Sequence, residues 1–166
     1  SLWTTELHEM LLVGSLEPLE LDVPRISERF NQPQVIAALR EVGIATPEAL
    51  LGTWVTDRAG LETYAADALP VTDDRPRIEY ADWVRYDEIH RVLPALIGLR
   101  TSPPLSGADD AFVRAVAQER QRLMLFYQAA LNGSAGNREL WVRDMRSVLQ
   151  ADGSNAYYRW FDGSGN

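Results

Sequence analysis

The sequence predicts a mainly helical fold with a small β component, of the α+β class. Apolar residues recur at helical spacing over most of the chain beyond residue 30. Two short N-terminal segments, residues 2–5 and 9–14, instead carry the aromatic and branched residues typical of strands. The few residues between them predict a β-hairpin, and two long amphipathic stretches predict a helical hairpin in residues 109–161.

Start and stop signals of helices recur after the hairpin. Asn31 is expected to cap the first helix, with Pro33 in its first turn. Thr46-Pro47-Glu48 repeats the signal, because it sets a cap, a proline and an acid at the positive end of the helix dipole. The expected elements are helices over residues 34–42, 46–55, 59–68 and 86–97, and a short strand over 77–80.

The longest helix is expected over residues 109–131. Its apolar stripe is interrupted by Arg120, and Asn132-Gly133 is expected to stop it. Asn137 is expected to cap the next helix, and residues 155–161 form a last amphipathic turn. These pieces predict the second half of the chain as a helical hairpin with a short third helix.

Composition excludes several chemistries. All 16 basic residues are arginine, and the chain has no cysteine. A Schiff-base lysine, a P-loop lysine, a thiol nucleophile and a thiolate zinc site are therefore excluded. No glycine-rich phosphate loop occurs, so we expect no cofactor and no metal. The net charge of −8 argues against a nucleic-acid surface.

Charge is distributed unevenly along the chain. Residues 1–84 carry a net charge of −9, whereas residues 85–166 carry +1. This asymmetry predicts two parts, residues 1–85 and 86–166, and Pro103-Pro104 is the best linker candidate. No apolar run is long enough for a membrane span, so we expect no direct membrane insertion and a cytoplasmic chain.

The segment 69–80, Leu-Pro-Val-Thr-Asp-Asp-Arg-Pro-Arg-Ile-Glu-Tyr, is the most distinctive string. Its adjacent carboxylates suit an ammonium group, a divalent cation or acid–base chemistry. A structural role fits as well, because such residues build Asx turns and pair with neighbouring arginines. The candidate residues are Thr72, Asp73, Asp74 and Arg75.

Aromatic residues gather near the C-terminus. They fit a terminal helix that docks its aromatic face onto the core, or an exposed surface that binds a partner protein. Exposure separates the two interpretations, because a partner surface requires the rings to be open to solvent. The candidate partner residues are Trp141, Tyr157, Tyr158 and Trp160.

The N-terminal strings Ser1-Leu-Trp-Thr-Thr and Glu9-Met-Leu-Leu-Val-Gly-Ser, with Thr72-Asp-Asp-Arg-Pro, carry a family resemblance. They resemble the C-terminal end of bacterial spermidine synthase-like proteins, the aminopropyltransferase type, in its membrane-fused branch. The resemblance covers about residues 1–85 and implies that the hairpin closes a Rossmann-like sheet. The family's activity is transfer of an aminopropyl group from decarboxylated S-adenosylmethionine to a diamine.

The resemblance also implies what this chain lacks. The family's nucleoside cradle and acidic catalytic loop lie upstream of the hairpin, so no catalytic residue carries over. We therefore expect a non-catalytic C-terminal region whose partner is the upstream Rossmann-like domain of a parent chain. The resemblance to the membrane-fused branch implies a membrane anchor in that parent. The open hairpin edge also suits a homodimer. The alternatives are a helical protein–protein interaction module and, more weakly, acidic polyamine contacts from Asp73 and Asp74.

Overall fold

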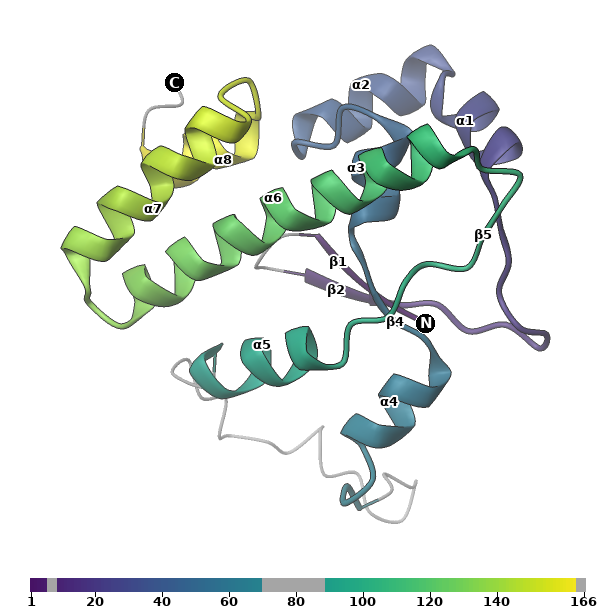
Figure 1. Ribbon diagram of the computed structural model, residues 1–166, viewed down its shortest axis with the longest axis horizontal. Coiled ribbons are helices and arrows are strands. Elements are labelled where there is room, and N and C mark those ends of the chain that lie inside the picture. Colours follow the sequence, from purple (N-terminus) through teal and green to yellow (C-terminus); the bar gives the residue numbers. More distant parts are fainter. Residues whose placement is uncertain (6–8, 70–88, 164–166) are drawn as a thin grey trace.

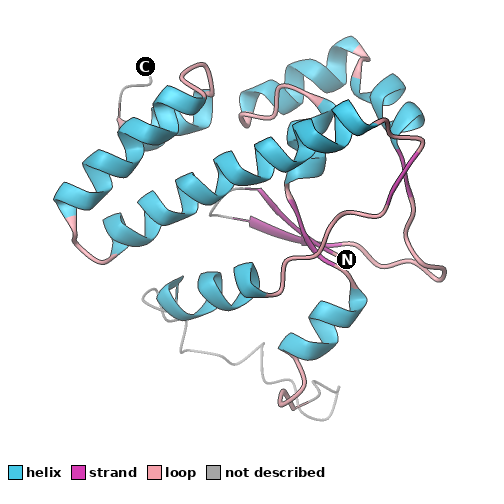
Figure 2. Ribbon diagram, in the orientation of Figure 1, coloured by secondary structure: helices cyan, strands magenta, loops and turns pink. Residues whose placement is uncertain are grey.

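The computed structural model describes residues 1–5, 9–69 and 89–163. It is mainly helical with a small sheet component, which confirms the predicted α+β class (Figures 1 and 2). In the described residues no helix has both the length and the apolar character needed to cross a membrane.

A three-stranded antiparallel sheet lies at the centre of the first half. It contains β1 (Leu2–Thr5), β2 (Glu9–Leu12) and β4 (Trp54–Thr56), in the order β2-β1-β4. The predicted hairpin of β1 and β2 is present, although β2 ends two residues before the expected stop at Gly14. Trp3 pairs with Trp54 across the sheet, and their rings meet edge to face at 5.1 Å.

The prediction that the helix beginning at Thr46 continues to Val55 is wrong. Thr46 does cap α3 (Pro47–Gly52) by accepting a bond from Ala49 N, but the helix ends at Gly52 and β4 begins at Trp54. Trp54 and Val55 have high β-propensity, and pairing with β1 buries them. Tertiary pairing therefore overrides the helical pattern here.

Two further elements of the first half were not expected. Asp22 accepts a bond from Arg25 N and so caps α1 (Val23–Phe30), with Pro24 in its first turn. A two-residue parallel pair joins β3 (Leu21–Asp22) to β5 (Leu105–Ser106). The helix expected at residues 34–42 exists as α2 (Pro33–Glu41), but Asn31 does not cap it. Asn31 is the C-cap of α1 instead, and Gln32, the second of the two residues between the helices, is the N-cap of α2.

The next two helices flank residues that lie outside the described ranges. The helix expected at residues 59–68 is α4 (Arg58–Tyr64), capped by Asp57 through Gly60 N. The one expected at 86–97 is α5 (Ile89–Gly98), which contains Pro94. The strand expected at residues 77–80 falls outside the described residues.

The second half forms the predicted helical hairpin. The long α6 (Asp110–Ser134) crosses the molecule, α7 (Arg138–Ala151) returns beside it, and α8 (Ala156–Asp162) follows (Figure 1). The prediction that α6 stops at Asn132-Gly133 is wrong. The helix continues to Ser134, and Gly136, at φ +74°, makes the turn. Gly133 has a packing role: a Cβ there would lie 2.9 Å from Trp141 Cδ1.

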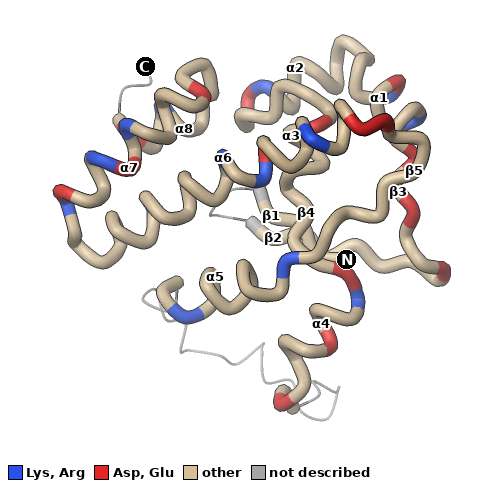
Figure 3. The backbone as a smooth tube through the Cα atoms, viewed as in Figure 1, with Lys and Arg blue, Asp and Glu red and all other residues tan. Residues whose placement is uncertain are grey.

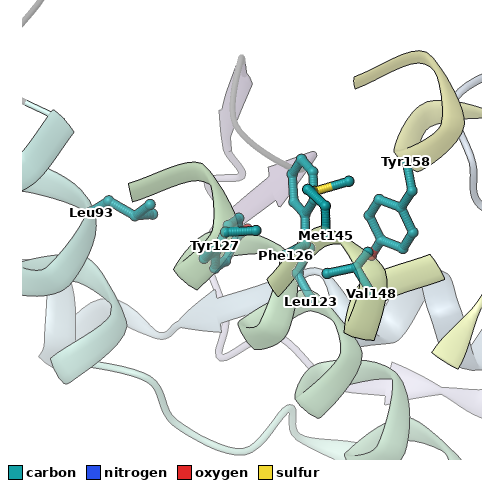
Figure 4. Close-up of a cluster of buried hydrophobic side chains, with 8 residues drawn as sticks. Leu93, Leu123, Phe126, Tyr127, Met145, Val148 and Tyr158 are labelled. Carbon is teal, nitrogen blue, oxygen red and sulfur yellow. The ribbon is translucent and has the colours of Figure 1, made fainter. Parts of the chain in front are cut away.

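Three clusters of buried side chains hold these elements together. The largest joins α5, α6, α7 and α8 around Phe126 and Met145, which are fully buried (Figure 4). A second surrounds Trp54 and Leu51 and includes Val116 of α6. The third consists of Leu2, Val55 and Leu96.

Residues before and after the proposed boundary at position 85 share two of these clusters. Tyr127 Oη donates to Thr4 Oγ1 at 2.9 Å, and Leu21 N donates to Pro104 O. The Pro103-Pro104 segment thus contributes to strand β3–β5 pairing. The division into residues 1–85 and 86–166 stays a prediction.

Candidate functional site: the open edge of the sheet

One edge of the three-stranded sheet is closed by the second half of the chain. Val55 O accepts a hydrogen bond from Thr101 N at 3.0 Å, and Trp54 O accepts one from the Arg120 guanidinium at 3.1 Å. Trp54 Nε1 adds a bond to Thr101 Oγ1. The outer backbone groups of β4 are therefore occupied, as buried carbonyls require.

The opposite edge is formed by β2, which pairs only with β1 in the described structure. Ser1 and Val13 exchange two backbone bonds, of 2.8 and 2.9 Å. Bonded and non-bonded pairs alternate along an antiparallel ladder, so the next bonded pair is Trp3 with Leu11. The backbone N–H and C=O groups of Met10 and Leu12 consequently point away from β1, toward the open edge.

Both faces of β2 are also partly open to solvent. The side chains of Met10, Leu11 and Leu12 are 46%, 58% and 67% exposed. Successive residues of a strand point to opposite faces, so exposure of all three means that each face is at least half open, although Met10 also lines a small cavity with Leu93 of α5 and Leu123 of α6. β1 and β4 carry no charged residue, and the only one in β2 is Glu9, at its start (Figure 3). Such an edge is a template for another strand.

A groove of about 740 Å³ begins where β2 ends. The loop after β2 forms one wall and α4 the other, with Trp54 at the base. Its polar side chains are partly engaged: Asp57 accepts from Gly60 N, and Arg58 pairs with Glu62 at 2.7 Å. The apolar residues that line it are Leu12, Val13, Leu16, Pro18, Leu19, Leu61 and Pro104.

The combination of edge and groove suits binding of an extended segment rather than chemistry on a small molecule. Backbone donors and acceptors of the edge supply affinity, and exposed side chains on both faces supply apolar contact. The sequence predicts the hairpin, but which of its two strands is left at the edge depends on the strand with which β4 pairs. No local pattern carries that information.

The loop residues Thr72, Asp73, Asp74 and Arg75 lie outside the described residues. Their role as a polyamine-contacting or structural loop stays a prediction. No contact within the described residues tests this role.

Three of the four aromatic candidates pack onto the core. Tyr158 is buried, and Trp141 and Tyr157 are half-buried against the largest cluster. Trp160 alone of these four is mostly exposed, at 62%, and its ring lies 5.8 Å from that of Tyr157. Asn155 caps α8 through the N–H groups of Tyr157 and Tyr158, which orients this docking. Exposure thus favours the docking interpretation over a partner surface.

A second, smaller pocket of about 220 Å³ lies between α3, α6 and the turn before α8. Glu119 pairs there with Arg122 at 2.6 Å. Burial raises the pKa of Glu119; Arg122 opposes this rise, and the charges of Asp152 and Glu48 add to it. Across this pocket Asn155 Nδ2 donates to Gly43 O at 3.0 Å, which joins the turn before α8 to the segment after α2.

Arg120 is the charged residue most affected by the fold. Burial, followed by the nearby charge of Arg100, lowers the pKa of Arg120 to about 10. Its guanidinium donates to Trp54 O and, at 2.7 Å, to Thr101 O. The interruption of the apolar stripe at this position was the sequence signal for this buried arginine, although nothing in the sequence named its partners.

Comparisons of the chain with family models, with curated proteins and with solved structures gave no match.

Proposed function

We propose that this chain is the non-catalytic C-terminal region of a spermidine synthase-like protein. Its β-hairpin joins the Rossmann-like sheet of an upstream domain in the parent chain, with β2 as the joining strand. The helices of the second half then form an additional layer that packs on the hairpin away from the joining strand.

The observation that carries this proposal is the incomplete environment of β2. A strand inside an open α/β sheet has a neighbour on each side and helices over both faces. In this chain β1 lies between two strands, and β4 is closed by Thr101 and Arg120. In the described residues β2 lacks a second neighbouring strand, and both of its faces are only partly covered; a larger sheet supplies the missing strand and the missing cover.

Binding to the separately produced upstream domain of such a parent tests the proposal. Leu11→Lys introduces a charge into the edge without removing a backbone donor, so it should weaken binding at least about tenfold. Val142→Lys is the matched control, because Val142 is similarly apolar and 41% exposed on α7. Equal affinities for the two variants, measured by biolayer interferometry, would contradict docking through β2.

Calorimetry tests the non-catalytic part of the proposal. The chain alone should show no heat of binding with decarboxylated S-adenosylmethionine or with 5′-methylthioadenosine, because the family's nucleoside cradle lies upstream of the hairpin. Micromolar affinity for either compound would overturn it.

A further inference from the structure

We propose that two copies of this chain associate through β2, in an antiparallel pair centred on Leu11. The two three-stranded sheets then become one six-stranded sheet across a twofold axis. This inference goes beyond the proposed function, and it rests on the geometry of the edge rather than on the family resemblance.

The backbone of β2 matches itself in this register. Centring the pair on Leu11 sets Met10 of one copy opposite Leu12 of the second copy, and the reverse. The N–H and C=O groups of both residues point to the open edge, so each facing pair exchanges two hydrogen bonds. A shift by one residue would bring inward-pointing groups to the interface and lose these bonds.

The exposed side chains also match themselves. Across the axis Leu11 meets Leu11 of the second copy on one face, and two Met10–Leu12 pairs form on the other. Facing apolar side chains on adjacent strands stabilise the pairing. The three residues that are 46–67% exposed in the single chain would thus gain cover on the side where β2 has no neighbour.

Charge selects the antiparallel arrangement. The only charged residue of the strand is its first, Glu9. An antiparallel pair centred on Leu11 places the two copies of this residue at opposite ends, each opposite Val13 of the other chain. A parallel pair would set them side by side, and like charges in that position are unfavourable. A self-complementary, isologous pattern of this kind is what a twofold dimer requires.

The second copy and an upstream strand need the same backbone groups. Each therefore excludes the other, and an upstream domain added in excess should dissociate the dimer. This competition allows the two proposals to fail separately.

Sedimentation equilibrium of the full chain tests the inference. The wild-type chain should show twice the single-chain mass of 18.6 kDa. Leu11→Lys and Leu11→Glu should each sediment as a single chain, because like charges then face each other at the axis. An equimolar mixture of the two variants should recover the double mass, since opposite charges now meet. Circular dichroism spectra equal to wild type show that both variants are folded.

Several results would overturn the inference. These are a wild-type chain that stays at the single mass, a Leu11→Lys variant that keeps the double mass, or a mixture that stays at the single mass. Val142→Lys, as control, should keep the double mass. A single-mass wild-type chain that still binds the upstream domain overturns only the dimer. A dimer that does not bind the upstream domain overturns only the proposed function.

Discussion

Arg120 lies within the apolar stripe of α6, where a charge must lose part of its hydration. Its guanidinium compensates for this by bonding Trp54 O of β4 and Thr101 O of the segment after α5. One side chain thereby connects three parts of the fold. An arginine suits this position because its planar fork has several fixed donors.

Arg120→Met should destabilise the chain by about 2–4 kcal/mol, because two partly buried carbonyl groups lose charged donors. Arg114→Met, an exposed position on the same helix, should change stability by less than about 0.5 kcal/mol. Urea unfolding monitored by circular dichroism measures both. Equal stabilities would show that the Arg120 bonds contribute nothing net.

Glu119 should make stability depend on pH. Its pKa in the folded chain is raised above the ordinary 4.5, so the folded state holds the proton more tightly than the unfolded state. The resulting stabilisation is present below the unfolded pKa and is lost as pH rises through the folded pKa. The melting temperature of wild type minus that of Glu119→Gln should therefore fall as the pH is raised above the ordinary pKa of 4.5. A constant difference would contradict the raised pKa.

At the scale of elements, close approach depends on small residues. Gly52 brings α3 near α6, where a Cβ would lie 2.9 Å from Glu119 Cβ. Gly60 packs α4 against the end of β4: a methyl group built there overlaps Thr56 Oγ1, which is fully buried. Glycine in these helices is a packing requirement, and helix propensity alone would favour alanine.

Gly60→Ala should therefore destabilise the chain by about 1–3 kcal/mol, although glycine-to-alanine changes in helices usually stabilise. Adding Thr56→Ala should remove most of the penalty that Gly60→Ala imposes. Gly98→Ala on α5 is the control, because nothing lies within 4 Å of the added carbon. Thermal melts of wild type, Gly60→Ala, Thr56→Ala and the double variant give the double-mutant cycle. A neutral Gly60→Ala would show that α4 shifts freely.

The sequence predicted correctly whether an element is a helix or a strand where its local signals agree with its tertiary contacts. The hairpin and the two long helices have strong periodicity, and the structure contains them. Residues 53–56 show the opposite case, because the helical pattern after Thr46 continues while β1 draws Trp54 into a strand. The open edge of β2 was partly predictable: the hairpin was expected, but the strand that pairs with the other edge of β1 is set by tertiary contacts.

At the scale of the whole molecule, the charge asymmetry between the halves does not correspond to separate cores. The cluster around Trp54 recruits Val116, and Leu2 and Val55 pack with Leu96. Residues 1–85 alone would lose partners of both clusters, whereas the largest cluster lies wholly within residues 86–166. Independent folding of residues 1–85 would then be unfavourable.

Residues 1–85, produced separately, should therefore lack a cooperative thermal transition, and addition of residues 86–166 should restore part of it. Differential scanning calorimetry measures both. Two independent cooperative transitions would instead establish the division that the charge pattern predicts.

The sequence by itself determined the α+β class, the hairpin, the helical hairpin and the excluded lysine and thiol chemistries, because these depend on local periodicity and composition. Only the tertiary structure decided which edge of the sheet is closed and which is open. Thr101 and Arg120 meet β4 from 46 to 66 residues away, and no local pattern encodes contacts of that range. The backbone groups of Met10 and Leu12 therefore remain available at the edge where we place the partner strand.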